Sequence, residues 1–192
     1  MSLLDLRLAA ARARRRPPEC VGCPLDPSTP GYDPLTGGGF VPPAGERSAP
    51  LLVVGIAPAE VEEQRGIPLC GPSGKKLDSA LTWALDGRRL EVRKLNAVNC
   101  RTSKVGLAGE VINRDPTAHE LRECGKRFLL PELASTTARV ILVLGQLVFD
   151  HLLKPRGVAL HRLPRVGHRF TFALTMGHRT KLPQTLFQED QQ

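Results

Sequence analysis

The amino-acid sequence predicts an α/β protein, with a three-layer α/β/α arrangement around a mainly parallel central sheet. Two apolar runs carry most of this prediction, LLVVG at residues 51–55 and RVILVLG at residues 139–145. Continuous apolar runs ended by glycine are typical of strands buried on both faces. Segments with helical spacing of apolar residues lie between the two runs. Alternation of strands with helices indicates a parallel sheet with right-handed crossovers.

The remaining elements follow from local signals. We expect helices over residues 2–15, 73–85, 116–133 and 146–153, and further strands over residues 94–100 and 169–175. Ser73 is a candidate N-cap, and Thr117 and Glu120 have the spacing of a capping box. Trp83 is expected in the core. Residues 24–50, rich in proline and glycine, predict a loop or hairpin rather than a regular element.

The length of 192 residues suits one compact domain with short tails. We expect a basic N-terminal helix or tail over residues 1–17, the folded domain over 18–182 and a C-terminal tail over 183–192. No apolar run approaches the roughly 20 residues of a membrane helix. The N-terminus also lacks the apolar core of a secretory signal. We therefore expect a cytoplasmic, intracellular protein with no membrane partner.

The chain is strongly basic, with a formal net charge of +8 and a sequence pI of about 9.7. Such a charge favours a polyanionic partner, of which nucleic acid is the commonest. The alternative is that the charge serves only to keep the protein soluble. Lys75 and Lys76 follow Gly74 at the start of an expected helix, which makes them candidate phosphate contacts. A solvated helix end is the alternative there.

The five cysteines form an odd set without a secretion signal, which argues against a disulfide framework. Cys20 and Cys23 are close enough in sequence to share one metal centre. Cys100 and Cys124 come from two other elements. One tight pair and two scattered thiols leave zinc, a [4Fe–4S] cluster and no metal open. Cys70 has apolar neighbours and is expected to be a small buried residue.

The carboxyl ends of the expected strands gather the unusual residues of the chain. Ligands of parallel α/β sheets bind outside these ends. The ends are residues 55–58, 96–100, 145–146 and 175–178. The turn after the first strand, GIAPAE, has the form of a loop that holds a small planar ligand, although Ile56 within it carries no reactive group. We therefore predict a binding site at this edge of the sheet.

The motifs, in chain order, resemble one family. They are the C-x-x-C pair at 20–23, GIAPAE at 55–60, GIPLCGPSGKKLD at 66–78, LNAVNCR at 95–101, NRDPTAHELREC at 113–124, VILVLGQ at 140–146 and a late histidine. Their order and spacing resemble the iron–sulfur, thermophile-type branch of the uracil-DNA glycosylase superfamily over roughly residues 18–182. The resemblance implies the fold of that superfamily and a [4Fe–4S] cluster held by Cys20, Cys23, Cys100 and Cys124.

The same resemblance implies roles at the strand ends. Gly55, Ala57 and Pro58 match the loop that holds a water and the sugar of a flipped nucleotide. Asn96 matches the asparagine that reads the uracil edge, because an amide both donates and accepts hydrogen bonds. His178 lies near the late histidine that donates to uracil O2.

Further contacts are expected with DNA, single- or double-stranded. The expected phosphate contacts are Lys75, Lys76 and Arg179, and Leu182 is expected to wedge into the base stack. A monomer associated with the nucleoid would fit this picture.

The sequence departs from the family pattern at the binding site. Ile56 stands where that branch has its acid, and Leu69 stands where a phenylalanine would stack on uracil. Glu60, Glu62 or Glu63 would approach the water from the next turn; the alternative is that they are solvated surface acids. No acid is needed if the sugar cation forms before water attacks.

Three functions follow from these observations. The first is monofunctional removal of uracil, or a related deaminated base, from DNA by hydrolysis of the N-glycosidic bond. The second is a catalytically silent glycosylase-fold protein that binds DNA or a partner. The third is a zinc-stabilised nucleic-acid-binding domain.

Overall fold

The computed structural model describes residues 16–35, 37–153, 161–162 and 171–175, and its main sheet has the strand order β3-β2-β6-β8-β7. The strands are β2 (Leu51–Gly55), β3 (Val92–Asn96), β6 (Val140–Leu144), β7 (His161–Arg162) and β8 (Thr171–Thr175). β2 pairs in parallel with β3 and with β6. The sequence prediction of strands at 51–55 and 139–145 is confirmed.

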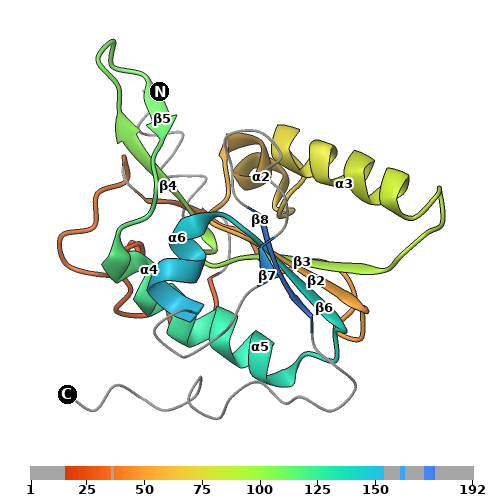
Figure 1. The fold of residues 1–192 in the computed structure, drawn as a ribbon. Helices are drawn as coiled ribbons and strands as arrows, with labels where there is room; N and C mark the ends of the chain where they lie inside the picture. The colour runs from red at the N-terminus through yellow and green to blue at the C-terminus, as the bar shows by residue number, and fades with distance from the viewer. Residues whose placement is uncertain (1–15, 36, 154–160, 163–170, 176–192) are drawn as a thin grey trace.

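Helices cover both faces of this sheet (Figure 1). The short helix α2 (Glu60–Arg65) and α3 (Pro72–Ala84) lie on one face. On the other face are α4 (Ala118–Cys124), the π-helical turn η2 (Gly125–Leu129), α5 (Leu130–Ser135), α6 (Gln146–Val148) and the π-helical turn η3 (Phe149–Leu153). The predicted three-layer α/β/α arrangement is thus confirmed. Among the described residues, no helix combines the length and apolar character needed to cross a bilayer.

The burial of β2 on both faces explains why this strand has no polar residue. Leu51 and Val53 pack against Leu77 and Leu81 of α3. Their neighbours Leu52 and Val54 belong to the larger core on the opposite face, together with residues of α4, η2 and α5. Because successive side chains of a strand point to opposite faces, both halves of the sequence pattern must be apolar.

The two crossovers that lead to the neighbours of β2 lie on opposite faces of the sheet. α3 covers one face between β2 and β3, whereas α4, η2 and α5 cover the other face between β3 and β6. β2 therefore lies between two neighbours reached by crossovers on opposite faces. Ligands of open α/β sheets bind at the carboxyl end of a strand at such a switch point.

A second sheet continues from β3. It contains β1 (Gly37–Phe40), β4 (Cys100–Val105) and β5 (Val111–Asn113), all antiparallel. The single strand predicted over 94–100 is therefore two strands with a break after Asn96. β1 also corrects the prediction that 24–50 holds no regular element: Phe40 is buried and pairs with Cys100. The β4–β5 hairpin projects from the body of the protein (Figure 1).

The predicted helix at 116–133 begins as expected but is not regular. Thr117 Oγ1 accepts from the Glu120 backbone N at 3.2 Å, and the Glu120 carboxylate accepts from the Thr117 backbone N at 2.7 Å. The predicted capping box is confirmed. After Cys124 the helix widens into η2 before α5 begins at Leu130.

Two predictions about α3 are wrong. Its N-cap is Gly71, not Ser73, because Pro72 occupies the first helical position, where proline is well tolerated. Trp83 is 86% exposed rather than buried. The face of α3 that packs on the sheet carries Leu77 and Leu81, and Trp83 lies outside this stripe.

The strand predicted at 169–175 is present as β8, but it runs antiparallel to β6. Thr175 pairs with Val140, the first residue of β6. Thr175 therefore lies at the opposite edge from the ends of β2, β3 and β6, and the prediction that it joins them is wrong. An antiparallel strand needs no helical crossover, so strand–helix alternation gave no signal of its direction. His178, Arg179 and Leu182 lie outside the described residues.

Glu120 gives a test of how this fold is held. Burial raises the pKa of its carboxyl, but hydrogen bonds from Arg114 and Thr117 outweigh this effect and the net pKa is lowered. Both guanidinium Nη atoms of Arg114 donate to it, at 2.6 and 2.7 Å. We expect Glu120→Ala to lower the free energy of unfolding at neutral pH by about 3 kcal/mol, because a buried ion pair loses one partner.

The pH dependence follows from the sign of that shift. A depressed carboxyl pKa stabilises the fold above the unfolded value, near 4.5, and the contribution is lost as pH falls through the folded pKa. In urea unfolding followed by circular dichroism, wild type should lose more stability on acidification than Glu120→Ala does. Parallel pH profiles would contradict this.

Candidate active site and cysteine cluster

Three predicted binding residues meet at the carboxyl end of β2. Gly55 pairs in register with Asn96. A Cβ placed on Gly55 would lie 2.2 Å from Asn96 Oδ1 and 3.2 Å from Leu69 Cδ2. Only glycine fits at this position without displacing the amide. The structure therefore brings Gly55, Leu69 and Asn96 together, on the face of the sheet that α3 covers.

The Asn96 side chain is a buried polar group at this edge of the sheet, unpaired among the described residues. Asn96 is 1% exposed, and within the described part of the protein neither Oδ1 nor Nδ2 has a hydrogen-bond partner. An unpaired buried polar group costs about 1–3 kcal/mol. A ligand that presents a donor beside an acceptor would satisfy both atoms of this amide.

Sequence reasoning missed a second amide of the same kind. Asn99 is fully buried, and neither polar atom of its side chain has a partner among the described residues. Its backbone N donates to Cys124 Sγ at 3.3 Å. The available signal was the polar residue itself, placed between the apolar residues 97–98 and Cys100.

Leu69 is held in an unusual conformation. Its φ of 53° lies in the left-handed region, which is rare for a residue with a branched side chain. Glu62 Oε1 accepts a hydrogen bond from the Leu69 backbone N. A Cβ on Gly74 would lie 1.7 Å from the Leu69 carbonyl oxygen, so α3 packs directly on this residue. The position of Leu69 is thus fixed from two sides.

The three acids after the GIAPA turn have separate roles. Glu62 is buried and also accepts from the Ala59 backbone N at 2.6 Å. Glu63 accepts from the Gly39 backbone N at 2.5 Å and lies 3.2 Å from Arg101 Nη1. Both therefore hold the fold together and are not solvated acids. Of the three, only Glu60 has a largely exposed side chain, at 58%.

Ile56 faces away from the Asn96 amide. It packs against the larger core, on the opposite face of β2. A Cβ on Gly145 would lie 2.5 Å from Ile56 Cδ1, and Gly145 has a φ of 116°, which only glycine adopts readily. Ile56 therefore fills the space beside the carboxyl end of β6. Ala57 packs against the same core, and Pro58 is buried.

Four of the five cysteines belong to the larger core. They come from three elements and the turn after η1 (Pro18–Cys20), and each is at most 6% exposed: Cys20, Cys23, Cys100 and Cys124. Cys70 is only half-buried and is not part of this core. Among the described residues, no three His, Cys, Asp or Glu side chains are arranged to hold a metal ion. The predicted ligands thus share a core but do not form a preassembled metal site.

Burial dominates the ionisation of these thiols. It raises the pKa of Cys20 to about 11 and that of Cys100 to about 12, and it also raises the pKa values of Cys23 and Cys124. The charges of neighbouring thiols contribute in the same direction to the pKa shifts of Cys20, Cys100 and Cys124, which places these sulfur atoms and that of Cys23 within electrostatic reach of one another. Metal ligation requires thiolates, and removing four buried protons needs compensating positive charge.

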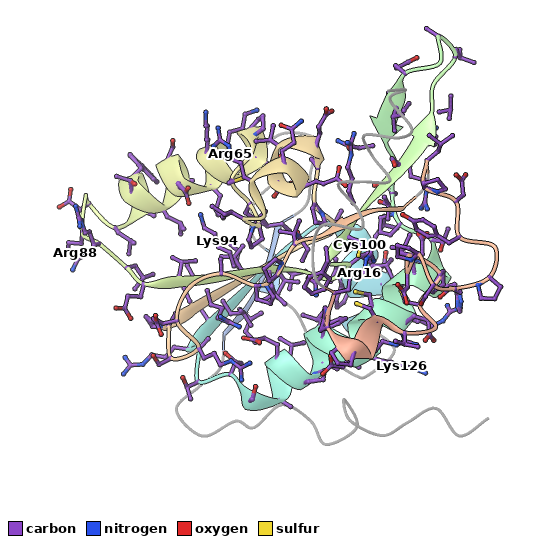
Figure 2. All side chains as sticks on the ribbon, turned by 180° about the vertical axis from the view of Figure 1, so that it is seen from behind. Arg16, Arg65, Arg88, Lys94, Cys100 and Lys126 are labelled. Atoms are coloured by element: carbon purple, nitrogen blue, oxygen red, sulfur yellow. The ribbon has the colours of Figure 1, made fainter. Side chains whose placement is uncertain are left out.

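Two arginines supply positive charge beside this cysteine cluster. Arg16 Nη1 donates to Cys100 Sγ at 3.1 Å (Figure 2). Arg127 Nη1 donates to the backbone carbonyls of Glu19 and Val21, at 3.0 and 3.1 Å. Both charges lower the pKa values of Cys20 and Cys23, against the larger effect of burial.

Lys75 and Lys76, the predicted phosphate contacts, are exposed in the first turns of α3.

A family model of the uracil DNA glycosylase superfamily matches residues 42–187. The chain is 34% identical over 107 residues to a Type-4 uracil-DNA glycosylase of Archaeoglobus fulgidus. It is 28% identical over 130 residues to one from Saccharolobus solfataricus and 30% identical over 123 residues to one from Pyrobaculum aerophilum. These matches cover 56%, 68% and 64% of this chain, and 49%, 56% and 58% of the respective relatives.

The doubly wound sheet, the switch point and the buried amide beside it define an α/β protein with a candidate ligand site at the carboxyl edge of β2 and β3. With the match over residues 42–187, the chain belongs to the uracil-DNA glycosylase superfamily. The predicted resemblance to its thermophile-type branch is confirmed by the relatives named Type-4 uracil-DNA glycosylase. Much of each relative lies outside the matched segment.

Glu62 provides a test of how the site is positioned. We expect Glu62→Ala to lower the free energy of unfolding by about 3 kcal/mol, because the backbone N–H groups of Ala59 and Leu69 lose their acceptor. The matched control is Glu60→Ala, for which we expect a change below about 0.5 kcal/mol. Urea unfolding measures both. Equal effects of the two substitutions would show that the Glu62 carboxylate does not hold the loop.

Proposed function

We propose that this protein removes uracil, or a related deaminated base, from DNA by hydrolysing the N-glycosidic bond. The observation that carries the proposal is the Asn96 amide, which is buried and unpaired at the switch point of the sheet. The relatives named Type-4 uracil-DNA glycosylase support the same activity.

In this proposal Asn96 reads the edge of the base. Uracil presents the O4 acceptor beside the N3–H donor, so Nδ2 would donate to O4 and Oδ1 would accept from N3–H. Cytosine has a donor in place of O4 and an acceptor in place of N3–H, so an amide in this orientation would leave both of its atoms unpaired. Leu69, fixed beside Gly55, would supply an apolar wall for the base. The base must first leave the DNA stack to reach this edge.

The chemistry would rest on stabilising the departing base. The bond between C1′ and N1 breaks, and its electron pair leaves with the base as negative charge shared among N1, O2 and O4. The Asn96 amide would donate to O4 as this charge grows, and His178 would donate to O2, the role that the resemblance implies for it. Donors fixed before the reaction stabilise such charge without reorganisation.

Water would then complete the reaction by adding to C1′ and releasing a proton to solvent. Glu62 and Glu63 are engaged in holding the fold, and Ile56 has no base. We infer that the water is oriented rather than strongly activated, since an oxocarbenium-like sugar reacts with a weak nucleophile. Such a mechanism predicts slow turnover.

We further propose that Cys20, Cys23, Cys100 and Cys124 hold a [4Fe–4S] cluster. The donor set fits this group, because four buried thiols from separate elements share one core with two arginines beside them. A single zinc ion would need its four sulfur ligands about 4 Å from one another, given Zn–S bonds near 2.3 Å. The described side chains contain no such preassembled group. When bound, the cluster would cross-link these elements, and hydrolysis would need no electron transfer.

The parts of the proposal outside the described residues come from the sequence. We propose a glycosylase domain over residues 18–182 that acts as a monomer on single- or double-stranded DNA. Lys75 and Lys76 would contact phosphate together with Arg179, and Leu182 would enter the base stack.

A second candidate function is that of a catalytically silent protein that binds DNA or a partner. The observation that favours it is the absence of a free acid beside the GIAPA turn among the described residues, apart from Glu60. Retained DNA binding without base release would support this function.

The proposed activity is tested on a uracil-containing single-stranded oligonucleotide, with alkaline strand scission as the readout. We expect wild type to release uracil, and Asn96→Ala to lower the rate about 10²–10³-fold because a donor to the leaving base is lost. We expect a loss of similar size for His178→Ala. Ser79→Ala, an exposed substitution on α3, serves as the control and should retain full activity.

The outcomes separate the two candidate functions. No base release by folded wild type would overturn the glycosylase proposal for uracil. Full activity of Asn96→Ala would show that the Asn96 amide takes no part in the reaction.

The cofactor is tested by iron analysis and visible absorbance of protein purified without oxygen. We expect about four iron atoms per chain and a brown colour. Cys124→Ser should lose most of the iron, whereas Cys70→Ser, the control thiol outside the cysteine cluster, should keep it. A colourless protein with one zinc per chain would instead identify a zinc site.

A further inference from the structure

Arg16 is tied into the protein by three hydrogen bonds. Nη1 donates to the Leu25 carbonyl oxygen at 2.7 Å and to Cys100 Sγ at 3.1 Å, and Nη2 donates to the Gly38 carbonyl oxygen at 2.6 Å. These acceptors belong to the segment after the C-x-x-C turn, to β4 and to β1. The guanidinium therefore joins three parts of the chain that surround the thiols.

This placement differs from what the sequence indicates. Arg16 closes a run with Arg12, Arg14 and Arg15 that reads as a basic, solvated tail. An arginine of a solvated tail would not lie in hydrogen-bond contact with a buried thiol, as Arg16 does. Its Nε is buried and has no partner among the described residues, so the site accepts the desolvation of a cation. Such desolvation is compensated when a negative charge lies beside the guanidinium.

We propose that Arg16 is a positioning residue for the cluster, which it stabilises by donating a charge-assisted hydrogen bond to the Cys100 thiolate. The inference rests on the [4Fe–4S] cluster proposed above. Hydrogen bonds to ligand sulfur and nearby positive charge favour the more negative, reduced state of a cluster, and so raise its reduction potential. The same bond holds the Cys100 ligand when the cluster is challenged by a chelator.

Arg127 does not carry the same role. Its Nη1 donates to the backbone carbonyls of Glu19 and Val21, and its Nη2 donates to the Glu123 carboxylate at 3.1 Å. It therefore holds the C-x-x-C turn against η2. Of the two arginines beside the cysteine cluster, Arg16 is the one with a direct contact to sulfur.

The test compares Arg16→Met, Arg16→Lys and Arg88→Met in the full chain, loaded with cluster. Arg88 is exposed beyond the end of α3, well away from Cys100 in Figure 2, and its loss changes the net charge by the same one unit. The readouts are the rate of cluster loss to a chelator, followed by visible absorbance, and the reduction potential by film voltammetry. Circular dichroism confirms the fold of each variant.

We expect Arg16→Met to lose its cluster at least tenfold faster and to shift the balance of reduced to oxidised cluster at least tenfold toward the oxidised form. That shift corresponds to a potential lower by about 59 mV for one electron. Arg16→Lys keeps the positive charge but loses the planar guanidinium with its several fixed donors. Its rate of cluster loss and its reduction potential should therefore fall between those of Arg16→Met and wild type. Arg88→Met should match wild type.

Each outcome has a separate meaning. Wild type without iron would overturn the cofactor proposal. An unchanged potential in Arg16→Met, even with faster cluster loss, would overturn the inference, because a purely structural role moves retention alone. Should Arg16→Met fail to fold, the potential of Arg16→Lys decides in the same way.

Discussion

The burial of β2 on both faces is the constraint on which the rest of the structure depends. Leu51 and Val53 require an apolar helix on one side, and Leu52 and Val54 require one on the other. The chain satisfies both by crossing over on opposite faces. The consequence is a switch point at Gly55, the kind of place where ligands of open α/β sheets bind. The location of the candidate site thus follows from the burial of four apolar side chains on the two faces of one strand.

Charged side chains then fix the irregular parts of the structure to this sheet. Arg101, only 3% exposed in its side chain, lies between Glu60 and Glu63 of α2 and also donates to Asn113 Oδ1. It joins the β4–β5 hairpin to the helix that follows the GIAPA turn. Glu62 holds that turn to Leu69. Of the three acids that the sequence offered as candidates near the water, Glu62 and Glu63 instead hold the structure together.

The sequence predicted those elements whose signal is local. The strands at 51–55 and 139–145 and the capping box of Thr117 depend on side chains that are neighbours in the chain. Trp83 was misplaced because helical spacing alone does not say which stripe of α3 meets the sheet. β1 was missed because its glycines pair with β4, far away in sequence. The meeting of Gly55 and Asn96 followed from the parallel topology, whereas the unpaired state of the amide needed coordinates.

Ile56 and Gly145 have a consequence for the history of this protein. The isoleucine occupies the space that a side chain at position 145 would need, and the glycine adopts a φ of 116° that other residues resist. Neither position can therefore drift alone: a smaller residue at 56 leaves a void beside β6, and a larger one has no room to grow. Among relatives of this chain we expect the two positions to change as a pair, so that an acid at position 56 would depend on the residue that follows a different strand.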